Sequence, residues 1–421
     1  MSYLSPYHPD QLEPKVPSFD ISTIPDEEID QPAGNQELLP KALKSPATRK
    51  VIFPPLILGC STFGYGIYAD DDNIKSNLPL RIIRLAMRCG INAFDTSPWY
   101  HPSEIILGEI LATLKYPRGS YHLITKVGKY GPNSKDHHFD PETIRKSVER
   151  SLKRMKTDYL DVVYLHDIEY ILPPPSYSGN PLDSLSKILE DGSGPTNEEQ
   201  ILLTAVETLR ELKSQGKILK VGIAGYPLPV LLRIALLILK TSGKGLDVLQ
   251  TYSHQTIQNS SLSSGYLKAF NDQAKVENVI SAAPLSMGLL TSSGGPDWHP
   301  ARSHSKLFET TRQVVEKCKE NNTTIEDVSL NFGYRPIYQD KTKKIPIVIG
   351  CINLEQLHST LNKYKQVNPT FSYEDAEQEA RDWDIQDEKA VRFENEIGKM
   401  FENNGVKNWS WECPTDKQRS G

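Results

Sequence analysis

Short apolar runs alternate with stretches of helical periodicity along most of the chain. Eight such runs, each of five to seven residues, are expected as strands: 56–60, 91–95, 122–126, 160–166, 220–224, 246–252, 279–283 and 345–350. Between them, apolar residues recur every three or four positions. This spacing predicts helices over 79–89, 103–115, 140–156, 198–215, 229–239, 266–276, 305–320, 324–334 and 354–365. Eight strand–helix repeats, with no GxGxxG motif after the first strand, predict a (β/α)8 TIM barrel rather than a doubly wound sheet.

The barrel is expected to occupy residues 51–366, between two extensions. Residues 1–50 contain eight prolines and little apolar periodicity, so this N-terminal extension should be largely extended or disordered, or packed over the barrel. Residues 367–421 form a partly helical extension, in which the acidic tract 374–387 should be a solvated face. Two long loops at the barrel mouth, 169–197 and 286–304, are rich in Gly, Ser and Pro.

Residue chemistry at helix starts allows two local predictions. Asp140, followed by Pro141, should cap the helix that begins there, and Ser103 is a candidate cap for its own helix. In the tail, Trp409 and Trp411 are expected to anchor the chain on the barrel.

Composition narrows the class of protein. The 421 residues carry a net charge of −5, which argues against a nucleic-acid partner held by charge. The five cysteines are scattered without a CxxC pair, so neither a metal site nor a disulfide framework is indicated. The N-terminus has no apolar signal core, and the apolar run 228–239 is too short for a bilayer and contains Arg233. We therefore expect a cytoplasmic protein with no membrane association and no obligatory protein partner.

Three of the predicted strands end in a polar residue of a distinct chemical type: Asp95, Lys126 and His166. The carboxyl ends of barrel strands meet at one mouth, so these side chains should converge there with Tyr100, which follows Asp95 by five residues. The Lys126 ammonium should lower the pKa of Tyr100, Asp95 should hold the lysine, and a neutral His166 could bond a substrate oxygen. Such a group shuttles a proton but needs a separate hydride acceptor, so a cofactor is implied.

Each of these residues also has an ordinary structural interpretation. Asp95 alone could be a helix cap or part of an ion pair, Lys126 a solvated strand end, and His166 a satisfied core histidine. Their joint placement after three successive strands favours the catalytic interpretation.

Residues 50–365 resemble the aldo-keto reductase superfamily. The resemblance rests on Gly59, Phe94-Asp-Thr-Ser-Pro-Trp-Tyr100, Thr125-Lys126, Leu165-His166, Lys220-Val-Gly-Ile-Ala-Gly225 and Ile345-Pro-Ile-Val-Ile-Gly350. It implies that Tyr100, Asp95, Lys126 and His166 are the family's catalytic tetrad. The Asp-Thr-Ser-Pro-Trp-Tyr string and the later Trp298-His-Pro-Ala301 are most similar to fungal NAD-dependent D-arabinose 1-dehydrogenases, which resemble plant L-galactose dehydrogenases.

The same resemblance implies a set of cofactor-binding residues: Gln250, Pro284, Leu285, Ser286, Gly288, Gly350 and Gln356. Gln250 could instead be an ordinary strand residue, and the turn at 284–288 a plain loop. Two positions depart from the family pattern. Ala282 stands where an aromatic residue often stacks on the nicotinamide, and Ala224-Gly225 replaces the usual Ser-Asn. Gln356 and the neighbouring Glu355 occupy the place of an arginine that binds the extra phosphate of NADP, which predicts NAD unless Lys363 reaches in.

Substrate binding is expected from Trp99, Trp298 and His299, although Trp298 and His299 could equally pack their own loop. The resemblance implies oxidation of an aldose at C1, D-arabinose to D-arabinono-1,4-lactone in the route to erythroascorbate, an ascorbate analogue. Two alternatives remain: NADPH-dependent reduction of aldehydes at the same site, and a regulatory barrel without fast turnover, as in the superfamily's channel subunits.

Overall fold

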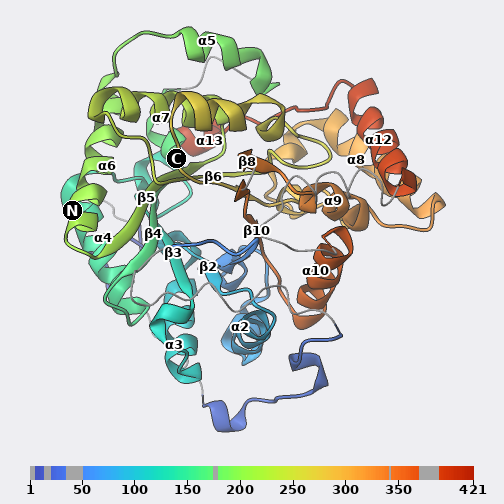
Figure 1. Ribbon diagram of the computed structural model, residues 1–421, viewed down its shortest axis with the longest axis horizontal. Helices are drawn as coiled ribbons and strands as arrows, with labels where there is room; N and C mark the ends of the chain where they lie inside the picture. The colour runs from blue at the N-terminus through green and yellow to red at the C-terminus, as the bar shows by residue number, and fades with distance from the viewer. Residues whose placement is uncertain (1–4, 14–19, 35–50, 174–178, 341–342, 369–387) are drawn as a thin grey trace.

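A closed barrel of eight parallel strands forms the centre of the molecule (Figure 1). The computed structural model describes residues 5–13, 20–34, 51–173, 179–340, 343–368 and 388–421. Around the barrel the order is β1, β10, β7, β6, β5, β4, β3, β2, which is the chain order of a (β/α)8 barrel and confirms the predicted fold. The strands are β1 (Leu56–Gly59), β2 (Ala93–Asp95), β3 (His122–Val127), β4 (Leu160–His166), β5 (Ile218–Gly225), β6 (Val248–Tyr252), β7 (Val279–Ala282) and β10 (Ile347–Ile349).

Helices cover the outside of the barrel (Figure 1). They are α1 (Asp71–Lys75), α2 (Leu78–Arg88), α3 (Ser103–Leu114), α4 (Pro141–Arg154), α5 (Leu185–Glu190), α6 (Asn197–Ser214), α7 (Leu228–Ser242), α8 (Ser305–Glu320), α9 (Ile325–Tyr334), α10 (Leu354–Val367), α12 (Glu388–Asn403) and α13 (Asp416–Ser420). Within the described ranges, no helix is long and apolar enough to span a bilayer.

One predicted helix needs correction, and one further element is present that was not predicted. The helix expected over 266–276 is two π-helical segments, Leu262–Tyr266 and Ala269–Gln273. A hairpin that was not predicted, β8 (Tyr338–Asp340) with β9 (Lys343–Lys344), precedes the last barrel strand.

Of the two predicted caps, only one is present. Asp140 caps α4 by accepting a hydrogen bond from the Thr143 amide, as expected. Ser103 does not cap α3, because its hydroxyl lies in the interior, where it donates to the Cys60 carbonyl at 2.7 Å.

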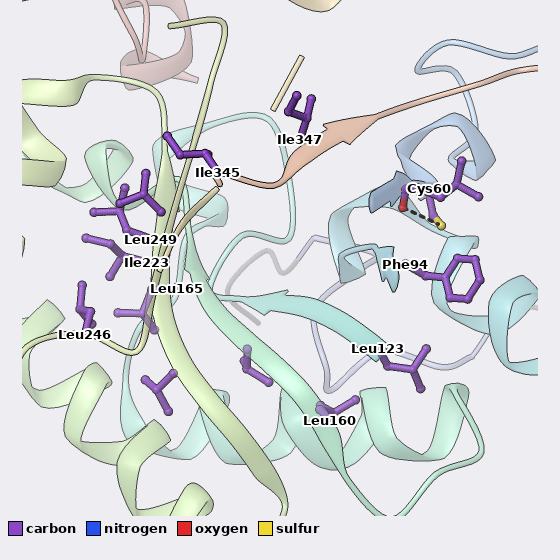
Figure 2. Close-up of a cluster of buried hydrophobic side chains, with 14 of the residues drawn as sticks. Cys60, Phe94, Leu123, Leu160, Leu165, Ile223, Leu246, Leu249, Ile345 and Ile347 are labelled. Atoms are coloured by element: carbon purple, nitrogen blue, oxygen red, sulfur yellow. Dashed lines mark hydrogen bonds between the residues drawn. The ribbon is translucent and has the colours of Figure 1, made fainter. Parts of the chain in front are cut away.

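Side chains alternate between two apolar layers along each strand, because successive residues of a strand point to opposite faces. Inside the barrel lie residues such as Ala93, Ile124, Val162, Tyr164 and Val248. The alternate positions pack between the strands and the helices. Figure 2 shows Phe94, Leu123, Leu165, Ile223 and Leu249 of this outer layer. The strict alternation decides which polar residues face the barrel interior.

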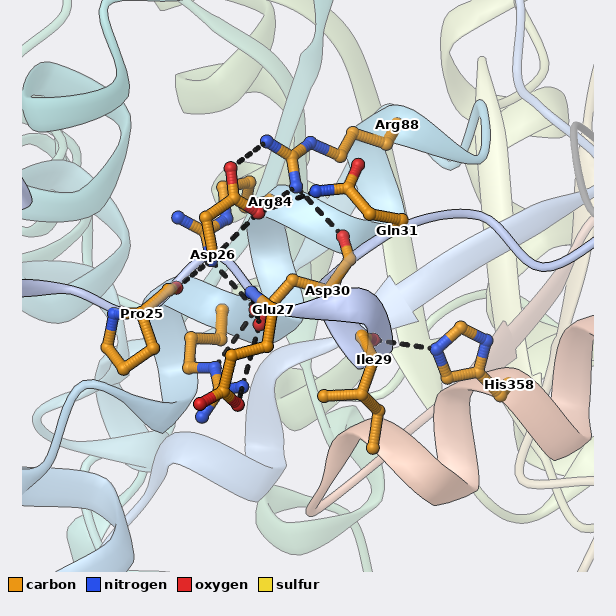
Figure 3. Close-up of polar contacts among 10 residues, drawn as sticks. Pro25, Asp26, Glu27, Ile29, Asp30, Gln31, Arg84, Arg88 and His358 are labelled. Carbon is orange, nitrogen blue, oxygen red and sulfur yellow. Dashed lines mark hydrogen bonds and ion pairs between the residues drawn. The ribbon is translucent and has the colours of Figure 1, made fainter.

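The described part of the N-terminal extension packs against the barrel helices (Figure 3). The Asp30 carboxylate is fully buried and bonds Arg81 and Arg84 of α2 at 2.7 Å each. The Ile29 carbonyl accepts a bond from His358 of α10 at 2.8 Å. Residues 20–34 therefore tie the first barrel helix to the last.

The C-terminal tail returns to the barrel mouth. Trp411 stacks on Tyr226, just after β5, with ring centroids 4.1 Å apart. Trp409 packs against His304 at 4.1 Å. These contacts agree with the predicted anchoring of the tail by its tryptophans. The acidic tract 374–387 lies outside the described residues.

Candidate active site

Four polar residues occupy inward-facing positions at the carboxyl ends of neighbouring strands. Asp95, Lys126, His166 and Gln250 each lie two residues after an interior residue of the same strand: Ala93, Ile124, Tyr164 and Val248. The alternation of the strands therefore points all four into the mouth of the barrel.

Lys126 and Asp95 form an ion pair that is almost completely buried. Lys126 Nζ lies 2.5 Å from Asp95 Oδ1 and donates a second bond to the Thr96 carbonyl at 2.9 Å. Burial raises the pKa of Asp95, while the charge and hydrogen bond of Lys126, and a hydrogen bond from Gln250, act to lower it. The carboxylate thus depends on Lys126 for its ionised form, and the lysine is held in one orientation.

Tyr100 is brought to this pair by a short helical turn, Pro98–Tyr100, directly after β2. Its hydroxyl lies 3.5 Å from Nε2 of His166, and Lys126 Nζ is 4.9 Å from the centre of its ring. The structure therefore places the predicted Tyr, Asp, Lys and His together.

The pKa of Tyr100 moves in the direction opposite to the one expected. Burial raises it well above its ordinary value, and the charges of Asp95 and Asp167 raise it further, with a contribution from Tyr68. The physical reason lies in the ion pair. At 2.5 Å the charge of Lys126 is largely compensated by Asp95, so little of it remains to stabilise a phenolate. Tyr100 is a neutral phenol here.

His166 is neutral, as predicted. Burial lowers its pKa well below the ordinary value, and the positive charges of Lys126 and Lys129 act in the same direction. Its Nδ1 lies 2.9 Å from the hydroxyl of Ser97, a buried contact that sequence analysis did not identify. Nε2 is left to face Tyr100.

A second buried ion pair lies beside the tetrad and was also missed. Lys129 Nζ is 2.6 Å from Asp167 Oδ2, and this ammonium lies over the rings of Trp99 at 5.7 Å and Tyr170 at 4.5 Å. Asp167 has a left-handed backbone, with φ of 47°, directly after His166. In the sequence, Asp167 could have been identified as a candidate site residue because it directly follows His166 at the end of a strand.

Gln250 is the predicted cofactor residue with the clearest signal for a ligand. Its side chain is buried, and within the described parts of the chain its Oε1 has no hydrogen-bond partner. A buried carbonyl oxygen without a partner is costly, and an amide N–H of a ligand would satisfy it. The residue therefore fits a nicotinamide carboxamide.

The predicted turn at 284–288 has a strained backbone. Ala283, Ser286 and Met287 all have positive φ, between 49° and 56°, and Gly288 has φ of 92°. Non-glycine residues with positive φ are uncommon and concentrate at functional sites. Pro284 and Leu285 lie within the same turn, and the buried Ser286 hydroxyl has no bonding partner in the described structure. This turn is suited to a polar ligand such as a pyrophosphate.

Gly350 directly follows β10, and Gln356 lies in the first turn of α10. A Cβ at Gly350 would approach Thr62 to 2.9 Å, so the chain passes close here. Gln356 is exposed, and its side chain accepts a bond from the Ile352 amide at 3.0 Å. Lys363 is paired with Asp327 at 3.0 Å.

The three predicted substrate residues lie in different surroundings. Trp99 contacts the N-terminal Tyr7 edge-on at 5.6 Å. Trp298 is 44% exposed, contacts the 37% exposed Tyr68 at 5.5 Å, and donates a bond to the Ile67 carbonyl. Tyr68 was not predicted, and its loop after β1 meets the loop after β7 here.

The side chain of His299 makes hydrogen bonds within the loop after β7. It is buried, its Nε2 donates to the Ser286 carbonyl at 2.9 Å, and its Nδ1 accepts from the Ala301 amide at 3.0 Å. Both ring nitrogens are therefore occupied, which favours the loop-packing alternative over sugar binding for His299.

Comparison with known proteins identifies the family of this chain. The chain is 32% identical over 318 residues to D-arabinose 1-dehydrogenase of Saccharomyces cerevisiae, covering 74% of this chain and 83% of that protein. It is 34% identical over 281 residues to L-galactose dehydrogenase of Arabidopsis thaliana, covering 65% and 74%. A third relative, at 30% identity over 252 residues (56% and 66%), is the NADH-specific methylglyoxal reductase of Escherichia coli. The sequence profile of the Aldo/keto reductase family matches residues 55–378, so the protein belongs to this family of nicotinamide-dependent oxidoreductases.

Proposed function

We propose that the protein oxidises an aldose at C1 to the aldonolactone, with NAD as the hydride acceptor. D-arabinose, giving D-arabinono-1,4-lactone, is the first candidate substrate. The observation that carries this proposal is the position of the Tyr100 hydroxyl, 3.5 Å from His166 Nε2 and backed by the buried Lys126–Asp95 pair. Two groups that can exchange a proton with one oxygen face the same point in the mouth.

Each residue of the tetrad has a separate role in the proposed reaction. The C1 hydroxyl binds between Tyr100 and His166, and His166 orients its oxygen. Tyr100, in its ionised form, takes the hydroxyl proton as the C1–H bond breaks and the carbonyl of the lactone forms. A nicotinamide cofactor, when bound, supplies the acceptor for the hydride from C1. The phenolate that accepts the proton is negatively charged before the transfer and neutral after it. Lys126, whose Nζ is 4.9 Å from the centre of the ring, faces that charge, and the ion pair with Asp95 holds Lys126 in place.

A sugar fits the groups around the tetrad. Trp298 and Tyr68 offer exposed aromatic surface at the mouth, and a sugar presents an apolar C–H face to such rings. Lys129 and Asp167 can exchange hydrogen bonds with hydroxyl groups deeper in the site. The two relatives named as sugar dehydrogenases support the same substrate class.

NAD is favoured over NADP by charge at the start of α10. Gln356 and Glu355 are exposed there, and a carboxylate would repel an additional phosphate. Lys363 is paired with Asp327, so this cation is not directed toward the helix start.

We propose that the lactone produced by the reaction enters a cytoplasmic route to erythroascorbate.

The main alternative is aldehyde reduction at the same site, since the tetrad works in both directions and the Escherichia coli relative is named as a reductase. Steady-state assays of the purified protein with pentoses, L-galactose and simple aldehydes decide between them. We expect the highest kcat/KM for NAD-dependent lactone formation. A higher kcat/KM for NADPH-dependent aldehyde reduction would overturn the proposed direction and cofactor.

A further inference from the structure

The hydroxyl of Ser97 is enclosed between the catalytic histidine and the turn that carries Tyr100. Ser97 is fully buried. Its Oγ accepts a hydrogen bond from the Trp99 amide at 3.1 Å and lies 2.9 Å from Nδ1 of His166. The backbone amide can only donate, so the direction of the first of these bonds is fixed.

The direction of the second bond follows from where the hydroxyl hydrogen can go. In the described structure, Nδ1 of His166 is the remaining group within hydrogen-bond distance of the Ser97 hydroxyl. If Nδ1 carried a proton and donated it, the buried hydroxyl hydrogen would be left without an acceptor. A buried donor without a partner costs about 1–3 kcal/mol. Both the Ser97 hydroxyl and Nδ1 of His166 are satisfied when Ser97 donates a hydrogen bond to an unprotonated Nδ1.

A neutral imidazole carries one N–H proton, so an unprotonated Nδ1 means that this proton is on Nε2. Nε2 faces the Tyr100 hydroxyl at 3.5 Å and lies 3.9 Å from Oδ1 of Asp167, whose negative charge favours a proton on that side of the ring. His166 therefore presents a donor to the place where Tyr100 meets the substrate oxygen. The other tautomer would present a lone pair there, which cannot donate a hydrogen bond to that oxygen.

We propose that Ser97 is a positioning residue that selects the Nε2–H tautomer of His166, so that His166 donates a hydrogen bond to the reacting oxygen of the substrate. The role of the donated bond rests on the proposed function. The tautomer itself is a property of the free protein and can be measured without substrate.

Long-range ¹H–¹⁵N spectra of protein labelled at histidine report the tautomer, with the His166 signals assigned by their loss in His166→Gln. We expect wild-type His166 as Nε2–H, and Ser97→Ala should shift it toward the Nδ1–H form. Ser103→Ala is the matched control. It also removes a fully buried hydroxyl, one that bonds Cys60 and Thr96, and it should leave the His166 signals unchanged. Wild-type His166 in the Nδ1–H form, or unchanged signals in Ser97→Ala, would overturn the proposal.

Kinetics give a second test. Loss of the tautomer preference in Ser97→Ala should lower kcat for sugar oxidation about tenfold, equivalent to about 1.4 kcal/mol, with little change in affinity for NAD. Ser97→Thr, which retains a hydroxyl, should recover most of the rate. Equal kcat in wild type and Ser97→Ala would contradict the role in catalysis. If wild type itself oxidises no sugar, the proposed function fails while the spectra still decide the tautomer.

Discussion

Lys126 Nζ and Asp95 Oδ1 lie 2.5 Å apart, and both side chains are almost entirely excluded from solvent. Each charge is tolerated in the interior because of the other. Lys126→Met should therefore destabilise the fold by about 3–5 kcal/mol, since it leaves a buried carboxylate without its partner. Removing both charges, in Asp95→Asn with Lys126→Met, should recover much of that loss. Urea unfolding measures both variants, and a single mutant as stable as the double mutant would show that the pair does not hold these charges in place.

The raised pKa of Tyr100 predicts the pH dependence of the reaction. A proton acceptor must be deprotonated to act, and burial near Asp95 and Asp167 keeps Tyr100 protonated well above its ordinary range. The rate of oxidation should therefore rise with pH between about 7 and 10, where more of the phenol is ionised. The pH profile of kcat/KM for the sugar checks this. An oxidation rate that falls across this interval would contradict the assignment of Tyr100 as the acceptor.

Cofactor preference can be altered at the start of α10. Gln356→Arg adds a planar cation beside the place expected for the adenosine ribose, which should improve binding of NADP relative to NAD. Fluorescence titration with both cofactors measures the change. Lys363→Gln is a suitable control, because Lys363 is paired with Asp327 and its loss should leave the preference unaltered. An unchanged ratio in Gln356→Arg would place the phosphate pocket elsewhere.

Acid should release the N-terminal extension from α2. Burial acts to raise the pKa of Asp30, but hydrogen bonds from Arg81 and Arg84 prevail and lower it to about 2, from an ordinary value of 3.8. A depressed carboxyl pKa stabilises the fold above pH 3.8, and the stabilisation is lost as the pH falls toward 2. Asp30→Asn should lower the melting temperature near neutral pH, and the difference from wild type should shrink over that interval. If the difference in melting temperature between Asp30→Asn and wild type were the same at every pH, the ion pairs of Asp30 would not anchor the extension.

The sequence was most informative where local pattern and topology agree. Apolar runs ending in Asp95, Lys126 and His166 located three strands and the chemistry at their ends, because a parallel barrel brings all its carboxyl ends to one mouth. The π-helical segments after β6 were not foreseen, since their apolar spacing resembles that of an α-helix.

Contacts between segments that are far apart in the chain cannot be predicted from the local pattern of residues. The packing of Trp298 on Tyr68, and of Tyr7 on Trp99, joins loops far apart in the chain. The direction in which the pKa of Tyr100 is shifted differs from the prediction for a related reason. Its direction depends on full burial and on the separation of Lys126 from Asp95, and neither can be read from spacing.

In the proposed reaction, the phenol oxygen of Tyr100 accepts the proton during sugar oxidation. The most direct measurement is kcat for NAD-dependent oxidation of D-arabinose by wild type, Tyr100→Phe and Tyr334→Phe. Tyr334 is the matched control, a buried tyrosine that packs against Tyr364 of α10. We expect Tyr100→Phe to lower kcat on the order of 10²–10⁴-fold, with NAD affinity nearly unchanged, and Tyr334→Phe to retain the wild-type rate. Near-normal kcat in Tyr100→Phe would contradict the assignment of Tyr100 as the proton acceptor.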